Sequence, residues 1–187
     1  MTLDAADFTD GELAALAVAG RQRAYSALMA RHREPIYRLV RSHVGDADEA
    51  LDVTQQAFIA AFAALKRYDA GRPFRVWLSR IAINKCHDWS RRRSVRRLFA
   101  FARPLDEGVE VAEDAVPADD ALADAQRLET VMRAIASLPD NLKEPLILRT
   151  IEELSQAETA DVLGISAKAV ETRLYRARAR LAEMLRD

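Results

Sequence analysis

The stretch LSQAETADVLGISAKAVETRLYR, residues 154–176, decides the fold of the C-terminal part of the chain. Ser155, followed three residues later by Glu158, is the pattern of a helix N-cap with its capping box. Gly164 then provides the backbone freedom that a tight turn needs, and Ser166 caps a second, longer helix. Two capped helices joined through a glycine at this spacing predict a helix-turn-helix.

The second helix of this motif is predicted to read DNA. Val170 and Leu174 are spaced to face the core, and Ala160 is small where the two helices would cross. A helix fits the major groove, where arginine can pair with guanine and glutamate can accept a hydrogen bond from cytosine. A helical hairpin with a solvated basic face is the alternative. The residues predicted to contact DNA are Ser166, Lys168, Ala169, Glu171, Thr172, Arg173 and Arg176.

Composition favours a helical protein with one ordinary domain or two small ones. Hydrophobic residues make up 50% of the 187 residues, yet only 6% are aromatic and six are glycine. No apolar run could cross a bilayer and the first residues do not resemble a signal peptide, so a cytoplasmic protein is expected. A single Cys86 excludes an internal disulfide, and three scattered histidines predict no metal site. Cys86 and its neighbour His87 are therefore interpreted as structural, and no cofactor is expected.

Charge is strongly segregated along the chain, although the net charge is only −1. Residues 66–103 contain twelve Lys and Arg against two acids, whereas residues 104–124 contain eight acids and no base. A basic block beside an acidic one indicates a surface that binds nucleic acid, next to an acidic linker that stays in solvent. Two ordinary solvated faces are the alternative.

Hydrophobic periodicity divides the chain into two helical domains. The prediction is an all-α protein with a first domain at residues 10–97, a flexible acidic linker at 98–121, and a second domain at 122–187 that contains the helix-turn-helix. The linker is expected from its two prolines, its one-sign charge and its lack of a sustained period.

The last helix of the first domain, which Pro73 should begin, interleaves aromatic and basic side chains. Basic side chains can bind phosphates, and aromatic rings can stack on unpaired nucleotides. This combination suits DNA whose strands have been separated. Taken alone, Trp77 and Trp89 are more typical of a core. The preceding helix contains DVTQQAF, residues 52–58, where acid and amide groups lie beside a hydrophobic seam. By itself this stretch fits either a solvated face or a protein-docking face.

In combination, these blocks resemble the extracytoplasmic-function sigma factors of bacterial RNA polymerase. The resemblance covers nearly the whole chain. It rests on residues 52–58, on WLSRIAIN at 77–84 with Asp88 and the arginines 91–93, and on the C-terminal block with Leu138-Pro139, residues 154–166 and RLYRAR at 173–178.

The resemblance implies roles that spacing alone does not. It implies that the protein binds core polymerase through the β′ clamp helices, and that it melts and reads the minus-ten promoter element. The helix-turn-helix would read the minus-thirty-five element, and the linker would thread toward the active centre and the RNA exit path. The implied polymerase contacts are Asp52, Gln55, Gln56 and Ile59. The implied minus-ten contacts are Tyr68, Arg72, Arg75, Trp77, Arg80, Asn84, Lys85, Asp88, Arg91 and Arg92.

The same resemblance implies no catalytic activity and control by an anti-sigma factor. Thr159, Ala169 and Glu171 depart from the usual family pattern, which leaves the promoter sequence open. Two other classes of protein fit the sequence less well. An ordinary helix-turn-helix regulator would carry a receiver or ligand pocket in its first half, and none is apparent. A nuclease or integrase would need clustered carboxylates or an activated nucleophile, and the acids here lie in the linker or on docking faces.

Overall fold

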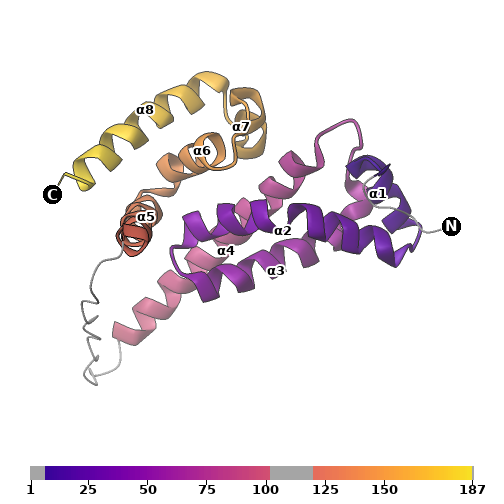
Figure 1. The fold of residues 1–187 in the computed structure, drawn as a ribbon, viewed down its shortest axis with the longest axis horizontal. Coiled ribbons are helices and arrows are strands. Elements are labelled where there is room, and N and C mark those ends of the chain that lie inside the picture. The colour runs from indigo at the N-terminus through magenta and orange to yellow at the C-terminus, as the bar shows by residue number, and fades with distance from the viewer. Residues whose placement is uncertain (1–6, 102–119, 187) are drawn as a thin grey trace.

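The computed structural model describes residues 7–101 and 120–186, and within these ranges every regular element is helical (Figure 1). The first group of helices comprises α1 (Asp10–Val18), α2 (Gln22–Val44), α3 (Ala47–Ala63), a short 3-10 turn η2 (Leu65–Arg67) and α4 (Phe74–Phe101). The second comprises α5 (Asp120–Ser137), α6 (Asp140–Thr150), α7 (Gln156–Leu163) and α8 (Ala167–Met184). The predicted all-α class is confirmed.

Helices α1 to α4 enclose the first hydrophobic core. Helix α2 packs against α1, α3 and α4, and α3 packs against α4. Gly45 ends α2 in the left-handed conformation, and the Asp46 side chain accepts a hydrogen bond from the Glu49 backbone N–H to begin α3, as its sequence predicts. Fully buried side chains in this core include Leu28, Ile36, Leu39, Val40, Val53, Phe74 and Leu78.

The second core lies between α6, α7 and α8. Ile147 and Leu148 of α6 are fully buried, as are Val170 and Ala177 of α8. The apolar residues of α8 recur at helical spacing, so one face of the helix enters the core while the other stays in solvent.

The two helical groups pack side by side, with α2 against α5 and α6, and α4 against α7 (Figure 1). Helix α6 is consequently covered on two faces. Its apolar face meets α8, while Lys143 and Glu144 on another face are buried against the first domain. The interface therefore combines polar contacts, made by Lys143 and Glu144, with apolar packing, because the buried hydrophobic residues of both domains form one continuous cluster.

The helices extend further into the predicted linker than expected. Residues 98–101 belong to α4, and α5 begins at Asp120 rather than near Leu122. Residues 98–101 contain no proline or glycine to end a helix. The rest of the predicted linker, residues 102–119, lies outside the described residues. No helix in the described part of the chain is long and apolar enough to span a membrane.

Two glycines that end helices allow a matched test of the packing between the domains. Gly45 and Gly164 both have positive φ, at 85° and 64°, but only at Gly45 would a Cβ atom meet a neighbour, the Ala136 Cβ at 2.9 Å. Gly164→Ala should lower the free energy of unfolding by about 1–2 kcal/mol, the cost of a left-handed residue. Gly45→Ala should cost more, because it adds a clash across the domain interface. Urea denaturation measures both, and equal losses would contradict the packing seen here.

Candidate nucleic-acid interface

The helix-turn-helix forms through the capping interactions that its sequence predicts. The Ser155 hydroxyl accepts from the Glu158 backbone N–H, and the Glu158 carboxylate accepts from the Ser155 N–H at 2.7 Å. Gly164 adopts the left-handed conformation, and the Ser166 side chain accepts from the Ala169 N–H. These bonds satisfy backbone donors that helix starts otherwise leave open. The angle between α7 and α8 is thus fixed largely by local chemistry.

A further contact connects the beginnings of the two helices. The Gln156 side-chain amide donates to the Ala167 carbonyl at 2.7 Å. Thr159, which departs from the family pattern, is fully buried, and its hydroxyl has no hydrogen-bond partner among the described residues. The burial of Thr159 agrees with the family pattern, whereas the Gln156 contact is not predicted from the sequence.

Helix α8 presents its predicted reading residues on or near the surface. Lys168 and Glu171 are exposed and form an ion pair at 3.0 Å, so the acid partly neutralises the base beside it. Thr172 donates its hydroxyl to the Lys168 carbonyl, while Arg173 is half-buried. Tyr175 is 77% exposed on the same helix and was not among the predicted contacts. An exposed aromatic ring in RLYRAR is the signal that could have indicated it.

The loop before α4 is held by an aromatic cluster. Tyr68, Phe74 and Trp77 pack together, with ring centroids 5.1–5.4 Å apart. The Tyr68 hydroxyl donates to the Arg72 carbonyl at 2.6 Å, and the Asp69 carboxylate accepts from the Gly71 N–H at 2.9 Å. Tyr68 and Trp77 therefore support the loop, and both remain half-buried rather than fully enclosed.

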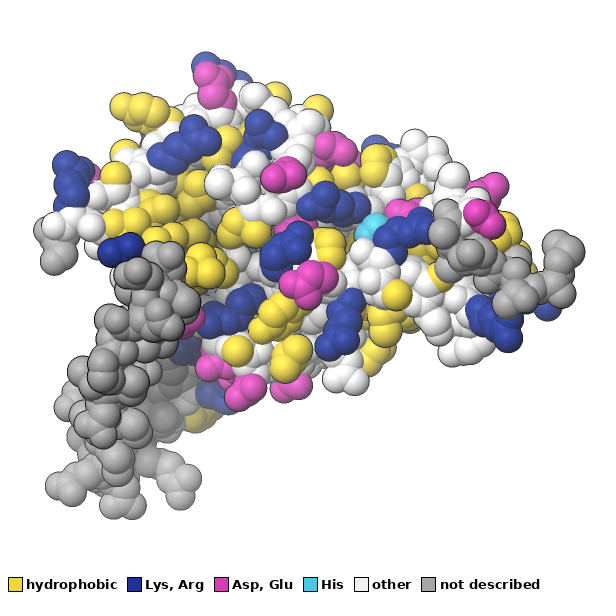
Figure 2. All heavy atoms as spheres, viewed as in Figure 1, with side chains coloured by type: hydrophobic (Ala, Val, Ile, Leu, Met, Phe, Trp, Pro, Cys, Tyr) yellow, Lys and Arg dark blue, Asp and Glu magenta, His cyan; other side chains and the backbone are white. Residues whose placement is uncertain are grey.

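The basic residues further along α4 are interleaved with polar partners. Asp88 pairs with Arg91 and lies 3.9 Å from Lys85, and these bases lower the pKa of its carboxyl, the Arg91 hydrogen bond most of all. Arg92 donates to the Gln56 amide oxygen at 3.1 Å. Arg80 and Asn84 are exposed. On the face drawn in Figure 2, Lys and Arg side chains alternate with Asp and Glu across both domains rather than forming one basic patch.

Two predicted minus-ten contacts are engaged by the other domain. Arg75 donates to the carboxylate of Glu152 at 2.8 Å and also to its backbone carbonyl. Glu152 is fully buried; burial raises the pKa of its carboxyl, and the Arg75 hydrogen bond opposes that rise. Arg72 forms a more exposed pair with Asp161 of α7 at 3.4 Å. The sequence analysis predicts Arg75 as a minus-ten contact, and no local pattern indicates this acidic partner 77 residues away.

The predicted polymerase contacts occupy the outer ridge of α3. Asp52 and Gln55 are exposed, Gln56 is half-buried, and Ile59 is 61% exposed. Asp52 lines two grooves at once. One, of about 540 Å³, lies toward α4 and includes Gln56 and Trp89; the other, of about 590 Å³, lies toward α2 and includes Gln55 and the exposed Leu51. The Asp52 carboxylate therefore lies on a ridge between two partly apolar grooves, a shape that a protein partner can bind.

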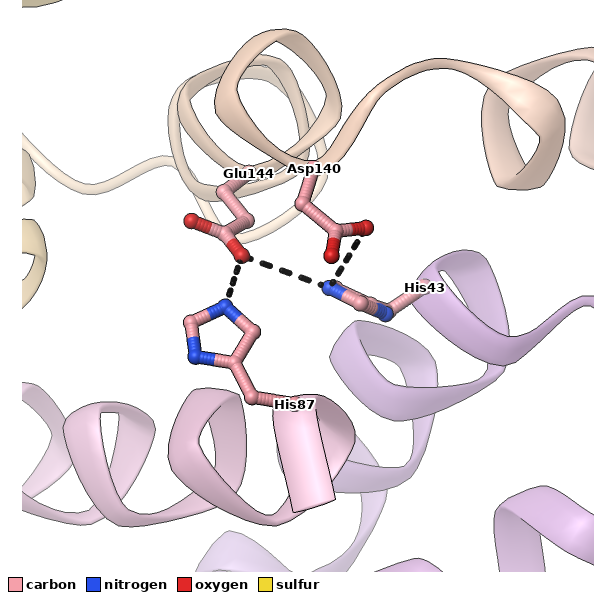
Figure 3. A group of neighbouring side chains, drawn as sticks. All are labelled: His43, His87, Asp140 and Glu144. Atoms are coloured by element: carbon pink, nitrogen blue, oxygen red, sulfur yellow. Dashed lines mark hydrogen bonds and ion pairs between the residues drawn. The ribbon is translucent and has the colours of Figure 1, made fainter. Parts of the chain in front are cut away.

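Two of the three histidines meet two acids at the domain interface (Figure 3). Glu144 Oε1 lies 3.4 Å from His43 Nε2 and forms a short contact with His87 Nε2. Burial alone would raise the pKa of Glu144, but the hydrogen bonds to His43 and His87 lower it to about 2. The hydrogen bond to Glu144 raises the pKa of His87, whereas desolvation lowers that of His43. The sequence prediction that the histidines are scattered is wrong for this pair, because the fold joins positions 44 residues apart.

Comparison with known proteins identifies the family. The Sigma-70 region 2 family model matches residues 28–96, and the Sigma-70, region 4 model matches residues 128–181. The RNA polymerase sigma factor CnrH of Cupriavidus metallidurans is 39% identical over 179 residues, covering 94% of each chain. The chain belongs to the ECF sigma factors of bacterial RNA polymerase. This sigma factor is also 31% identical to the ECF sigma factor SigW of Bacillus subtilis, over 90% of its own length and 92% of SigW.

Solved structures agree with this assignment. CnrH in complex with the cytosolic domain of CnrY superposes on this sigma factor with a TM-score of 0.68 at 35% identity, covering 94% of this chain and 96% of that one. The sigma factor RpoE of Bartonella quintana, in complex with the anti-sigma factor NepR, shares the fold with a TM-score of 0.66 at 22% identity. The predicted resemblance is thereby confirmed, and the protein is a transcription initiation factor rather than an enzyme.

The Lys168–Glu171 ion pair on α8 should limit the affinity of this sigma factor for duplex DNA. Glu171→Gln removes a negative charge and releases Lys168, so duplex affinity should rise and its salt dependence should steepen by about one unit of slope. Fluorescence anisotropy over a salt series measures both quantities. Glu183→Gln, which frees Arg180 in a similar exposed pair near the end of α8, is the matched control. Weaker binding of Glu171→Gln to one promoter sequence alone would instead make Glu171 a base-reading residue.

Proposed function

We propose that the two domains of this sigma factor read two promoter elements while α3 holds core polymerase. In this proposal residues 10–97 form the region 2 domain, residues 122–187 form the region 4 domain, and the acidic segment 98–121 sets their separation. The observation that carries it is the helix-turn-helix, whose capped geometry presents α8 to solvent. The protein would act in the cytoplasm, where polymerase is found.

The upstream element is assigned to the exposed face of α8. Lys168, Thr172 and Arg176 are exposed, which suits contact with base edges or phosphates. Ser166 and Ala169 lie at the N-terminal end of the helix, the end that enters the groove in helix-turn-helix proteins. Arg173 is half-buried, so its aliphatic stem can rest on the domain while its guanidinium reaches the DNA.

The minus-ten element is assigned to the loop and the first turns of α4. The aromatic cluster around Tyr68 and Trp77 offers ring surfaces, and Arg80, Asn84 and Lys85 continue along the helix. Base stacking on aromatic rings favours single-stranded DNA, which supports a role in holding the melted element. Arg72 and Arg75 can take part only after they leave Asp161 and Glu152, so promoter engagement requires the domains to separate.

An anti-sigma factor is the proposed regulator. CnrH is solved with the cytosolic domain of CnrY, and this chain resembles CnrH over nearly its full length. The surface around α3 exposes apolar side chains among charged ones, with Met29 and Leu51 in the groove toward α2 and Ile59 outside both grooves, and polymerase or an anti-sigma factor could cover it. Competition for this surface would explain how such a partner excludes polymerase.

Run-off transcription with core polymerase tests the proposed function. Addition of the purified protein should produce transcripts from a subset of a genomic promoter library. A folded protein that gives no promoter-dependent transcript would overturn the proposal. Tight, sequence-specific duplex binding without polymerase would favour an ordinary helix-turn-helix regulator instead.

Arginines on α8 give a second measurable expectation. Arg173→Ala or Arg176→Ala should weaken binding of the upstream element by about 1–3 kcal/mol if either residue pairs with a base. Electrophoretic mobility shifts of the holoenzyme on matched and mutated promoters measure this loss. Arg180→Ala, which removes an arginine already paired with Glu183, should have little effect. An equal loss on all sequences would reassign the arginine to phosphate contact.

Docking through α3 gives a third expectation. Asp52→Ala should weaken binding to core polymerase by about 2–5 kcal/mol if the carboxylate is buried against a basic partner. Asp48→Ala is the matched control, because Asp48 is an exposed acid on the same helix and lines neither groove. Titration of labelled sigma factor with core polymerase distinguishes the two variants. Similar behaviour of both would remove Asp52 from the docking surface.

A further inference from the structure

The histidine and acid cluster between the domains brings ligand atoms together from three helices. His43 lies in the last turn of α2 and His87 in the middle of α4, while Asp140 and Glu144 lie one turn apart on α6 (Figure 3). One atom from each of these four side chains lies within 4.8 Å of each of the others. Two ligands therefore belong to the first domain and two to the second.

The separations are close to those of a metal site. Metal–nitrogen and metal–oxygen bonds of 2.0–2.2 Å in a tetrahedron place neighbouring ligand atoms about 3.3 Å apart. His43 Nε2 lies 3.4 Å from Glu144 Oε1 and 3.9 Å from Asp140 Oδ1. The His87–Glu144 contact is shorter and would have to open. Side-chain adjustments of about an ångström would suffice, because Asp140 and His87 are both partly exposed.

Charge and accessibility also suit a cation. With both imidazoles neutral, the two carboxylates carry two negative charges, and Lys143, which pairs with Asp140, offsets one of them, so a net negative charge remains to attract a divalent ion. The side chain of His43 is fully buried and that of Glu144 is 8% exposed, whereas His87 and Asp140 are open enough to admit an ion from solvent. Imidazole with carboxylate favours first-row transition metals such as zinc over magnesium or calcium, which prefer oxygen ligands alone.

The Lys143 ammonium is a cation that would compete with a metal ion for the Asp140 carboxylate. This ammonium lies 3.1 Å from Asp140 Oδ1, and it donates to the backbone carbonyls of His43 and Ala136 at 3.2 and 3.0 Å. Those two carbonyls belong to different domains and keep Lys143 satisfied when Asp140 turns toward an ion. The lysine thus reduces the net negative charge of the cluster without occupying its centre.

From this geometry we propose that His43, His87, Asp140 and Glu144 bind one divalent transition-metal ion that locks the two domains together. An ion held by both domains stabilises the packed arrangement over the separated one, because separation would remove two of its four ligands. The same arrangement keeps Arg75 on Glu152 and Arg72 on Asp161. Metal binding itself does not depend on the proposed promoter contacts.

Calorimetric titration of the chelator-treated, full-length protein with Zn²⁺ tests the site. One ion per chain should bind, and Mg²⁺ should bind far more weakly. His87→Gln should weaken Zn²⁺ binding by about a hundredfold or more, since even outer-shell changes cost 10–100-fold. Asp140→Asn is a second ligand variant at a partly exposed position, where loss of the fold is not expected.

Two control variants separate this site from other sources of binding. His32→Gln removes the one histidine outside the cluster, and Cys86→Ser removes the only thiol. Both should retain Zn²⁺ binding. Unchanged binding in His87→Gln, or an equal loss in His32→Gln or Cys86→Ser, would overturn the site.

Hydrogen exchange tests the lock between the domains. Zn²⁺ should slow amide exchange both at the end of α2 and at the beginning of α6 in the unmodified protein, and in neither segment in His87→Gln. Slower exchange in only one of the two segments would show an ion held by one domain, and the proposed lock would then be wrong.

Discussion

The two-sided burial of α6 is the constraint on which the packed arrangement depends. One face of the helix supplies Ile147 and Leu148 to the second core, and another carries Lys143 and Glu144 into the domain interface. A buried carboxylate is tolerated only when it is paired and hydrogen-bonded. The burial of Glu144 therefore depends on its contacts with the two histidines of the first domain. The domains are joined both by these polar groups, which water could also satisfy, and by the apolar cluster that continues from one domain into the other.

The helix-turn-helix illustrates what the sequence could predict. Its caps and turn are local, because Ser155, Glu158, Gly164 and Ser166 act within a few residues of one another. The pattern of α8 likewise predicts a helix with one face in solvent, whereas residues 52–58 by themselves leave a solvated face and a docking face equally open. Their surface position is in the structure, while the roles of the individual residues rest on resemblance to the family.

Two of the features that the sequence does not predict depend on contacts between distant positions. Arg75, a predicted minus-ten contact, binds Glu152, and His43 and His87, which are far apart in the sequence, share Glu144. No periodicity or cap pattern reports which surface of one domain will meet the other. Tyr175 is a different case, because its exposure could be predicted locally: it lies off the helical spacing that directs Val170 and Ala177 into the core.

In the proposed function, the buried Glu152 carboxylate competes with DNA for Arg75. That carboxylate occupies the Arg75 guanidinium as a phosphate oxygen would, and Asp161 does the same for Arg72. An acid attached to the same chain acts at a high effective concentration, so it is an intramolecular competitor of the nucleic acid. In the proposed function, DNA bound to Arg75 must first displace the buried Glu152, whereas the exposed Arg72–Asp161 pair opposes binding much less. Glu152 therefore raises the affinity that DNA needs before the proposed contact with Arg75 can form.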